Sequence, residues 1–449
     1  MLSIRAKRNY NLPAIQKYRP PSKLDAPRKL REILTNHYNN KTASVTFGIL
    51  DPVQVVQAAP YIDTVYISGW TCASMYTSNN FFGADLADYP STTLPMQLQR
   101  LRNAQELHSV RLQKDICHPI IADGDTGFGG ATAVMKLTRM MIENGAAGMH
   151  LEDQRVDGKR CGHLSGKILV SCEAHIEKLR AARLQADIME SDLVLVSRTD
   201  AESATHIDTD IDPRDKPFIL GKVSGQNIPS ELKTTELTLP ELIKKLCEYK
   251  SVPCPPLSYM NIDELSAQLK NLDPTVQFDT SVLRSKEGFY KIRSGTAFAI
   301  NRAKHFSDYA DLQWIETSQP DLSQAIQIAK ELPIPLAYNL SPSFNWDKDH
   351  TELSMKSFSN DIAKLGFCWQ FSTVAAFHLY GLATTRFAKA FKEDSMLAYV
   401  KDIQRKEREE GVDTYKHQNW SGVNLIDEMV SLVSSSERKA GEGSTEKHF

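Results

Sequence analysis

Residues 118–153 read HPIIADGDTGFGGATAVMKLTRMMIENGAAGMHLED and contain a strand, a helix and a second strand. The runs His118–Ala122 and Gly148–Glu152 are short and mostly apolar, and carboxylates stand where each run ends. Residues 131–145, between them, repeat apolar side chains at helical spacing. This order of elements predicts two parallel strands of one sheet, joined by a helix that covers it.

The same alternation continues along the chain. It predicts a second helix over residues 173–190. Because it extends over about 300 residues, we predict a (β/α)8 barrel rather than an open sheet. The further strands are predicted at Tyr61–Ser68, Leu193–Ser197, Leu312–Glu316, Pro335–Asn339 and Phe367–Phe371.

The remaining segments are expected to surround this barrel. We predict an N-terminal helical segment over residues 1–44, the barrel domain over 45–430 and a polar C-terminal tail over 431–449. Residues 222–277 hold six prolines and interrupt the alternation, so we expect a short accessory insertion there. Residues 384–410 are rich in charge and predict one helix.

Composition excludes several classes of partner. The chain has 449 residues and a formal net charge of −2, which provides no broad basic surface. No apolar run is long enough to span a bilayer. We therefore expect no nucleic acid and no membrane among its partners. Seven cysteines at irregular spacing argue against a disulfide scaffold and for a reducing compartment.

Residues that carry chemistry follow the predicted strands. Barrel enzymes build their active sites at the carboxyl ends of the strands, so we expect these residues to meet at one mouth. Asp123, Asp125 and Glu152 supply hard oxygen ligands and predict a divalent-metal site; the alternative is solvated turn residues. The residues at strand ends are Asp123, Glu152, Arg198, Glu316, Asn339 and Thr373.

Three further groups have two readings each. Arg198 closes a β-branched strand and suits bidentate binding of a carboxylate. Asn339, Ser341 and Ser343 offer an amide and two hydroxyls for a carboxylate, or they form a simple turn. Trp70, which follows Ser68 and Gly69, is a core aromatic or a pocket wall.

Lys159-Arg160-Cys161-Gly162-His163 surrounds one thiol with three potential cations. Nearby cations lower a thiol pKa, and this predicts a reactive cysteine in a loop. The flanking glycines Gly158, Gly162 and Gly166 indicate that the loop is mobile. A zinc site at Cys161 and His163 would need a second Cys/His pair at ligand spacing, and the chain has none. A structural cysteine is the other alternative.

At these residues the chain resembles the isocitrate lyase family, in the superfamily of phosphoenolpyruvate mutase. The matching motifs occur in order along nearly the whole chain. Beside the cysteine loop and the segments above, they are Thr46-Phe47-Gly48, LDPVQV at 50–55, SGWTCAS at 68–74, DLADYP at 85–90, PFILG at 217–221, LAYNLSPSFNW at 336–346, WQFSTVAAFH at 369–378, KHQNWSG at 416–422 and GSTEKHF at 443–449.

The resemblance implies a fold, an assembly and a reaction. The barrel's last helix would be exchanged between subunits of a homotetramer. Mg²⁺, or alternatively Mn²⁺, would assist cleavage of a C2–C3 bond in a tricarboxylate, which releases succinate and a 2-oxo acid. Asp123 would bind the metal directly, with Asp85, Asp125 and Glu152 holding its waters.

Roles for the other site residues are also implied by the resemblance. Cys161 would protonate the succinate carbanion, and His163 and Arg198 would complete the catalytic set. Ser68, Gly69, Trp70 and Arg198 would bind the 2-oxo acid part. The succinate part would be bound by Gly162, His163, Asn339, Ser341, Ser343 and Thr373.

Two subfamilies compete for the substrate. The Lys-Arg-Cys-Gly-His order, with Arg160, is typical of 2-methylisocitrate lyases, whereas isocitrate lyases typically carry a second lysine. Leu151 stands where many isocitrate lyases have a bulkier aromatic residue, and Ser372-Thr373 departs from the usual Ile-Thr. We predict a 2-methylisocitrate lyase of the methylcitrate cycle, in propionyl-CoA breakdown, with Leu151 and Arg160 setting specificity.

The alternatives are an isocitrate lyase of the glyoxylate cycle and an inactive structural homologue, which would need a broken site. A carbon–phosphorus mutase would not need the cysteine loop.

The N-terminus bears on the compartment. Residues 1–24 carry six basic and no acidic side chains, as transit peptides do, and predict the mitochondrial matrix. Pro13, Pro20 and Pro21 interrupt any long amphipathic helix, and Lys7-Arg8-Asn9-Tyr10 resembles a stretch well inside the family's N-terminal region. The natural start is therefore expected upstream, and the cytoplasm or a glyoxysome/peroxisome is the alternative location.

Overall fold

The computed structural model describes residues 11, 13–21, 25–77, 81–226, 228–257, 260–434, 439–441 and 445–448. Most of the basic residues of the proposed transit peptide lie outside these ranges. So does the Lys7–Tyr10 stretch. In the described part of the chain, no helix combines the length and apolar character needed to cross a membrane.

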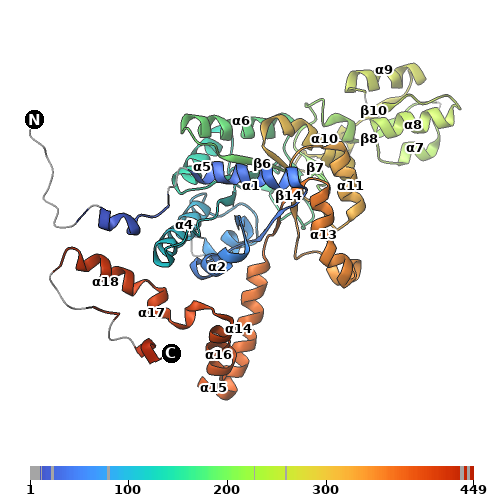
Figure 1. Ribbon diagram of the computed structural model, residues 1–449. Helices are drawn as coiled ribbons and strands as arrows, with labels where there is room; N and C mark the ends of the chain where they lie inside the picture. Colours follow the sequence, from blue (N-terminus) through green and yellow to red (C-terminus); the bar gives the residue numbers. More distant parts are fainter. Residues whose placement is uncertain are drawn as a thin grey trace, which may run out of the picture.

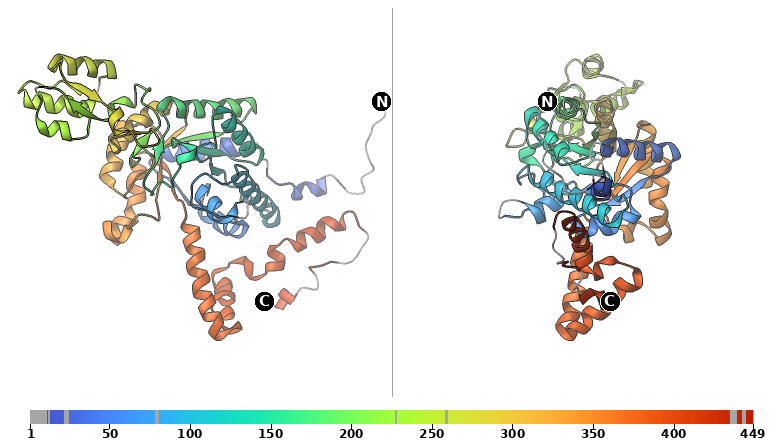
Figure 2. Two further views of the ribbon diagram at one scale, coloured as in Figure 1. Left: turned by 180° about the vertical axis from the view of Figure 1, so that it is seen from behind. Right: turned by 60° about the vertical axis from the view of Figure 1, so that its left-hand side comes forward.

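Eight parallel strands form the central sheet, in the order β1-β14-β13-β12-β6-β4-β3-β2 (Figures 1 and 2). A bridge between Gly48 and Tyr66 links the two edge strands, so the sheet is a nearly closed barrel. The predicted (β/α)8 barrel is thereby confirmed. The strands are β1 (Ser44–Phe47), β2 (Val65–Ile67), β3 (Ile120–Asp123), β4 (Gly148–Glu152), β6 (Val194–Thr199), β12 (Leu312–Ile315), β13 (Leu336–Asn339) and β14 (Phe367–Ser372).

Two strands differ from their predictions. β2 is shorter than Tyr61–Ser68, because Ala59–Tyr61 forms a 3-10 turn and the chain enters the sheet at Val65. The first strand, Ser44–Phe47, was not predicted by range, since its four residues are too few to establish an alternating pattern.

A helix follows each of the first seven strands and covers the outside of the barrel. β3 and α5 reproduce the unit predicted from residues 118–153, with the helix ending at Glu143. The covering helices are α2 (Pro52–Ala58), α4 (Thr93–Leu112), α5 (Ala131–Glu143), α6 (Cys172–Ile188), α10 (Thr296–Phe306), α11 (Leu322–Glu331) and α13 (Glu352–Lys364).

Helix α1 (Ala26–Asn40) closes the end of the barrel where the strands begin. Its Leu30 and Leu34 are buried in the same apolar cluster as Tyr66, Trp314 and other inward side chains of the strands. Arg31 bonds to the carbonyl oxygens of Asp192 and Leu193, which precede β6. Among the described residues, α1 therefore covers the floor of the barrel and leaves the opposite mouth as the entrance for ligands.

Residues 220–279 build a small separate layer at one end of the molecule (Figure 1). Three antiparallel strands pack there with three helices around an apolar cluster of their own, which includes Leu242, Leu246 and Leu265. The elements are β8 (Leu220–Ser224), α7 (Ser230–Thr234), β9 (Leu237–Thr238), α8 (Leu239–Tyr249), α9 (Ile262–Leu272) and β10 (Gln277–Asp279). A second small sheet joins β5 (Ile168–Leu169), β7 (His206–Ile207) and β11 (Tyr290–Lys291).

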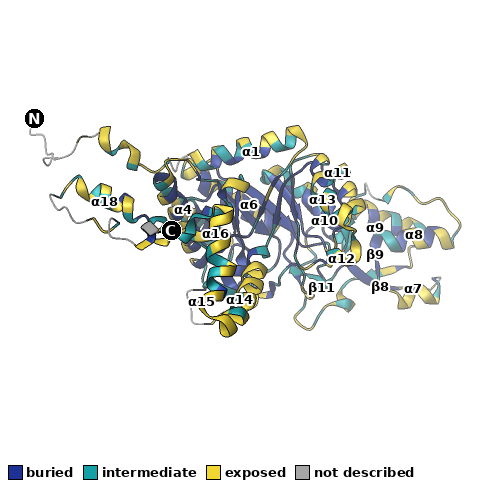
Figure 3. Cartoon of the chain, turned by 60° about the horizontal axis from the view of Figure 1, so that its bottom comes forward, coloured by how far each residue is buried: buried dark blue, intermediate teal, exposed yellow. Residues whose placement is uncertain are grey.

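The last barrel helix, α14 (Ala375–Asp394), projects away from the sheet instead of packing on it (Figures 1 and 2). Of its side chains, all within the described ranges, Ala376 alone is buried, and Figure 3 shows the helix largely exposed. The single helix predicted over 384–410 is wrong, because Ser395 adopts a φ of 50° and breaks it. Short helices follow: α15 (Met396–Tyr399), α16 (Arg405–Glu410), α17 (His417–Trp420) and α18 (Val423–Ser431).

Packing of α1 on the barrel floor gives a stability prediction. Leu30 is 0% exposed, so Leu30→Ala leaves a cavity and should lower the free energy of unfolding by about 2–5 kcal/mol. Leu353→Ala is the matched control, since Leu353 is 78% exposed and its loss should change stability by less than about 0.5 kcal/mol. Urea denaturation followed by tryptophan fluorescence measures both. Equal effects of the two variants would contradict the role of α1 as the floor.

Candidate active site

A cavity of about 250 Å³ opens at the carboxyl ends of the barrel strands. Most of the strand-end residues singled out in the sequence line it, together with the tip of the cysteine loop. The lining residues are Tyr66, Ser68, Trp70, Asp85, Asp123, Cys161, Gly162, His163, Arg198, Glu316, Asn339, Ser343, Thr373, Val374, Phe377 and His378.

One wall of the cavity is a cluster of carboxylates around a buried lysine. The Lys159 ammonium pairs with Asp85 and lies 3.6 Å from Asp125 Oδ2. Asp125 Oδ2 also accepts a hydrogen bond from Tyr89. The protein therefore supplies an ammonium of its own between these carboxylates.

Asp123 is fixed by backbone N–H groups of the segments that follow β2 and β3. Its Oδ2 accepts a hydrogen bond of 2.8 Å from Gly69 N, and its Oδ1 accepts one of 2.9 Å from Asp125 N. Burial opposes ionisation of Asp123, but His150, Lys159 and Arg198 together hold its pKa below the usual value. A side chain on Gly69 would meet Asp123 Oδ2 at 2.8 Å, so glycine is required there.

The donors fit a bound cation. Burial, with a smaller contribution from neighbouring carboxylates, raises the pKa of Asp125 to about 6 and that of Glu152 well above its usual value, so a bound cation would favour the ionised forms of both. Among the described residues, no three His, Cys, Asp or Glu side chains are close enough to hold a metal directly. The cluster therefore fits one direct carboxylate ligand, with its other oxygens reaching the ion through water.

Arg198 is the cation at the centre of the mouth, 7% exposed. Its Nε and Nη2 each donate to Asp200 at 3.0 Å, and Nη1 lies 3.2 Å from Glu152 Oε2. The guanidinium stacks over Trp314, with 4.5 Å between its carbon and the ring centre. The bidentate partner of Arg198 is thus a protein carboxylate, and Nη1 is the edge nearest the carboxylate cluster.

Glu316 joins the residues expected to bind the succinate part. It lies 3.5 Å from Arg198 Nη2 and 3.4 Å from His163 Nε2, and it accepts a 3.1 Å hydrogen bond from Asn339 Nδ2. His163 Nε2 also lies 2.8 Å from Ser341 Oγ. Asn339 Oδ1 is buried and, within the described part of the chain, has no hydrogen-bond partner. An orphaned acceptor of this kind is suited to a ligand hydroxyl.

The expected low pKa of Cys161 is wrong. Burial and the nearby Asp85 raise the pKa of this thiol to about 11, against the opposing effects of Arg198 and Lys159. The Lys159 ammonium turns toward Asp85 and Asp125, and Arg160 donates to the Lys159 carbonyl oxygen at 2.8 Å. The thiol is therefore held protonated, which suits an acid rather than a nucleophile.

Leu151 and Arg160 do not line the cavity, so direct contact with the substrate is not supported for either. Side chains alternate along β4: Glu152 faces the mouth, whereas Leu151 is buried in the layer between sheet and helices. A Cβ on Gly124 would lie 2.9 Å from Leu151 Cδ2, so Leu151 packs behind the turn that carries Asp123 and Asp125.

The other predicted residues outside the lining support it from behind. Asp125, Glu152, Gly69 and Ser341 each bond to a residue of the cavity wall or of its cluster. Sequence reasoning missed Tyr66, Tyr89, Val374, Phe377 and His378 as site residues. The ring of Phe377, from α14, packs edge-on against Trp70, with 4.9 Å between centres. Phe377 lies only five residues after the end of β14, and this closeness to a strand end could have identified it as a site residue from the sequence.

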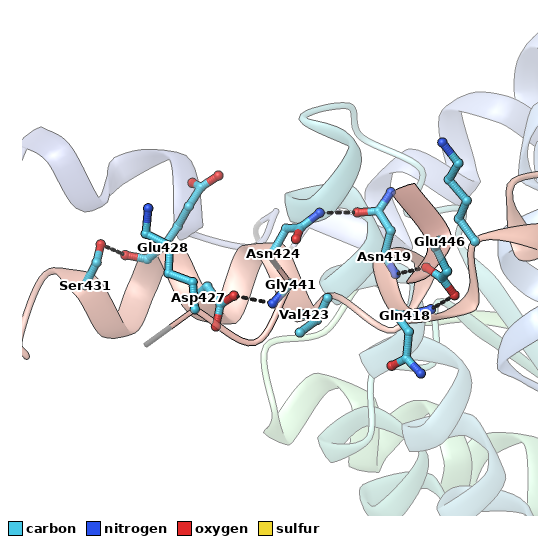
Figure 4. Close-up of a pocket in the computed structure, with 11 residues that line it drawn as sticks. Gln418, Asn419, Val423, Asn424, Asp427, Glu428, Ser431, Gly441 and Glu446 are labelled. Carbon is cyan, nitrogen blue, oxygen red and sulfur yellow. Dashed lines mark hydrogen bonds between the residues drawn. The ribbon is translucent and has the colours of Figure 1, made fainter. Parts of the chain in front are cut away.

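A larger cavity, of about 470 Å³, lies elsewhere, between α17, α18 and the C-terminal residues (Figure 4). Its polar groups bond to one another: Glu446 accepts from the backbone N–H groups of Gln418 and Asn419, and Asp427 accepts from Gly441 N. Because these groups satisfy each other and lie away from the strand ends, this cavity is a packing feature of the C-terminal segment.

The chain was compared with known proteins. It matches the isocitrate lyase family over residues 5–237 and 230–449. It is 40% identical to the isocitrate lyase of Oryza sativa subsp. japonica, over 95% of this chain and 86% of that protein. It is 38% identical to the mitochondrial 2-methylisocitrate lyase of Hypocrea atroviridis, over 97% of this chain and 88% of that protein.

Among solved structures, 2,3-dimethylmalate lyase, a member of the PEP mutase/isocitrate lyase superfamily, has the same fold. The TM-score is 0.55 at 19% identity, over 93% of this chain and 98% of that one. The strand-end cavity, the cysteine loop and these matches agree: the chain belongs to the isocitrate lyase family and is a lyase.

Proposed function

We propose that this lyase cleaves 2-methylisocitrate to pyruvate and succinate, with Cys161 as the acid. The acid role rests on the position of the Cys161 thiol, which lines the cavity. In that position, burial and Asp85 raise its pKa to about 11. A group that stays protonated at neutral pH can donate a proton to a carbanion.

The C2 hydroxyl loses its proton to a base or to solvent, and cleavage of the C2–C3 bond turns it into the carbonyl of the 2-oxo acid. The bonding electrons remain on C3 as a carbanion conjugated with a carboxylate. The Cys161 thiol protonates that carbon, and succinate is formed. As the bond breaks, negative charge spreads onto the carboxylate of the substrate that is conjugated with C3. Arg198, His163 and Asn339, which surround Glu316, supply the positive charge and the hydrogen bonds that stabilise it.

The carboxylate cluster supports a proposed Mg²⁺ site. Six buried carboxylates and three permanent cations, Lys159, Lys167 and Arg198, lie together at the mouth of the barrel, so net negative charge remains to be balanced. The carboxylates are Asp85, Asp123, Asp125, Glu152, Asp200 and Glu316. Asp123 would hold the ion directly, with Asp85, Asp125 and Glu152 around its waters. Bound there, Mg²⁺ or Mn²⁺ would polarise the 2-hydroxy acid and favour its alkoxide.

Isocitrate is the second candidate substrate. It is favoured by the 40% identity to the rice isocitrate lyase, whereas the Lys-Arg-Cys-Gly-His order of residues 159–163 favours 2-methylisocitrate. The apolar side chains Trp70, Val374 and Phe377 in the cavity wall could contact a methyl group. An inactive homologue is not favoured, because the site residues named above are all present.

The exposed last helix supports an oligomer. Phe377, Leu379 and Leu382 of α14 are 37–57% exposed, and such a surface calls for a partner. We propose that α14 is exchanged between subunits of a homotetramer. The mitochondrial matrix is the proposed location, and the Hypocrea relative, which is named mitochondrial, supports a mitochondrial location. The cytoplasm or a glyoxysome/peroxisome is the alternative.

The acid role of Cys161 predicts a specific loss. Cys161→Ser should lower kcat by about 10²–10⁴-fold, because a hydroxyl is a far weaker acid than a thiol. Cys254→Ser, at an exposed cysteine of the 220–279 layer, is the matched control and should keep wild-type activity. Succinate release by the purified, folded variants measures both. A Cys161→Ser enzyme that keeps more than about a tenth of wild-type kcat would contradict the acid role.

The cation site predicts a change in both activity and stability. Exhaustive chelation should abolish succinate release, and Mg²⁺ or Mn²⁺ should restore it. Lys159→Met removes the ammonium between Asp85 and Asp125, so their repulsion should lower the Tm, and Mg²⁺ should raise the Tm of this variant more than that of wild type. Lys364→Met, at an exposed pair with Asp361, is the control. Full activity after chelation would remove the metal from the mechanism.

Substrate choice is decided by the released 2-oxo acid. The extra methyl of 2-methylisocitrate should raise kcat/KM about 10–200-fold over isocitrate if an apolar pocket receives it. Pyruvate and glyoxylate formation, measured side by side, give the ratio, and faster cleavage of isocitrate would overturn the proposed substrate. Because Leu151 packs behind the Asp123 turn, Leu151→Phe should lower both rates alike. A selective shift toward isocitrate would place Leu151 at the methyl pocket after all.

A further inference from the structure

Lys167 is a fully buried lysine at the end of the cysteine loop, and it does not line the active-site cavity. Its ammonium has three hydrogens and donates to three acceptors: Gly162 O at 2.6 Å, Ser203 Oγ at 2.8 Å and Asp200 Oδ1 at 3.0 Å. A lysine is rarely buried unless it is paired in this way. Gly162 belongs to the cysteine loop, whereas Asp200 and Ser203 both lie in the segment after β6, so Lys167 connects these two parts of the site.

The base of the cysteine loop is fixed independently of Lys167's side chain. Its backbone oxygen accepts from Thr205 N at 3.0 Å, and the next residue, Ile168, begins β5. On the incoming side, a bridge joins Gln154 to Leu169, and Arg155 N donates to Ile168 O at 2.8 Å. Any movement of the cysteine loop is therefore a movement of its tip relative to this fixed base.

The tip of the loop lies directly against the substrate-binding arginine. A Cβ on Gly162 would be 2.7 Å from Arg198 Nη2 and 2.8 Å from Glu316 Cγ, so only the bare backbone fits. Arg198 is itself clamped by Asp200, the second acceptor of Lys167. One ammonium thus connects the backbone between Cys161 and His163 to the carboxylate that orients Arg198.

We propose that Lys167 is a positioning residue, which holds the cysteine loop against the Arg198–Asp200 pair so that Cys161 and His163 face the cavity. The proposal rests on the proposed function, because the thiol that it positions is the proposed acid. If the loop swings out, Lys167 loses Gly162 O but keeps Asp200 and Ser203, so its charge stays paired. At Lys167, release therefore costs one charged hydrogen bond rather than a buried unpaired ion.

Gly166, next to Lys167, has a φ of 82° and open space around it, which allows the chain to pivot there. Lys159, at the other side of the tip, pairs with Asp85 and Asp125. The loop tip is therefore held on both sides by buried ammonium groups, one directed at the carboxylate cluster and one at the base of Arg198.

The test measures how fast iodoacetamide alkylates each cysteine, by peptide mass spectrometry, on the full chain without substrate. Lys167→Met keeps the length and apolar stem of the side chain but removes the ammonium, and with it the bond to Gly162 O and those to Asp200 and Ser203. We expect Cys161 to react about tenfold faster than in wild type, which is the population shift that corresponds to one charged hydrogen bond. Exposed Cys254 calibrates the reagent, and buried Cys368 reports global unfolding.

Two further variants control the experiment. Ser203→Ala removes an acceptor of Lys167 outside the loop and should leave the Cys161 rate within about twofold of wild type. Lys167→Arg keeps the charge beside Asp200, and hence the fold, but its planar fork cannot donate three short bonds from one nitrogen. Lys167→Arg should also speed alkylation of Cys161 while Cys368 stays unreactive. If Lys167→Met unfolds, the Cys161 rate of Lys167→Arg tests the proposal instead.

Kinetics give a second readout. When the competent loop position is less populated, the apparent affinity for the substrate falls, so KM should rise about tenfold in the folded Lys167 variants. A partly unfolded preparation would lower kcat at unchanged KM. Wild-type Cys161 reactivity in both Lys167 variants would overturn the proposal. Because alkylation needs no turnover, this test stands even if neither tricarboxylate is cleaved.

Discussion

The burial of Arg198 among three carboxylates is the constraint on which the site depends. Glu152, Asp200 and Glu316 approach the guanidinium from β4, β6 and the end of β12. The strand register produces this, because Glu152 pairs with Arg198 across β4 and β6, and Glu316 N bonds to Thr199 O. A guanidinium stays buried only where carboxylates satisfy its donors, so the barrel must close in this register for the mouth to form.

The cysteine loop completes the site from above. Lys159 enters the carboxylate cluster, Gly162 lies against Arg198, and His163 reaches Ser341 and Glu316. The thiol between them is thereby placed over the cavity without carrying charge. Burial and the nearby Asp85 raise the thiol pKa, and Arg198 and Lys159 oppose this rise without overcoming it. The local sequence had predicted the opposite shift.

The barrel was largely predictable because the spacing of apolar residues along a strand or helix shows which side chains are buried. The first strand and the break at Ser395 were not, since four residues carry no period and Ser395 is not a residue expected at positive φ. Strand ends identified most of the cavity, but not the directions of side chains. The alternation of side chains along β4 places Leu151 on the opposite face to Glu152, and this could have been predicted from the sequence. The carboxylate partners of Lys159 and Lys167 and the Ser203 partner of Lys167 lie 33–74 positions away, so these contacts could not be predicted locally.

The central claim is that one fixed thiol protonates the carbanion from one side. Turnover in D₂O tests it most directly, since the Cys161 thiol exchanges with solvent. If the account is right, each succinate carries one deuterium on carbon, and the singly labelled product is a single enantiomer. Succinate without deuterium, or a racemic singly labelled product, would contradict protonation by a positioned acid.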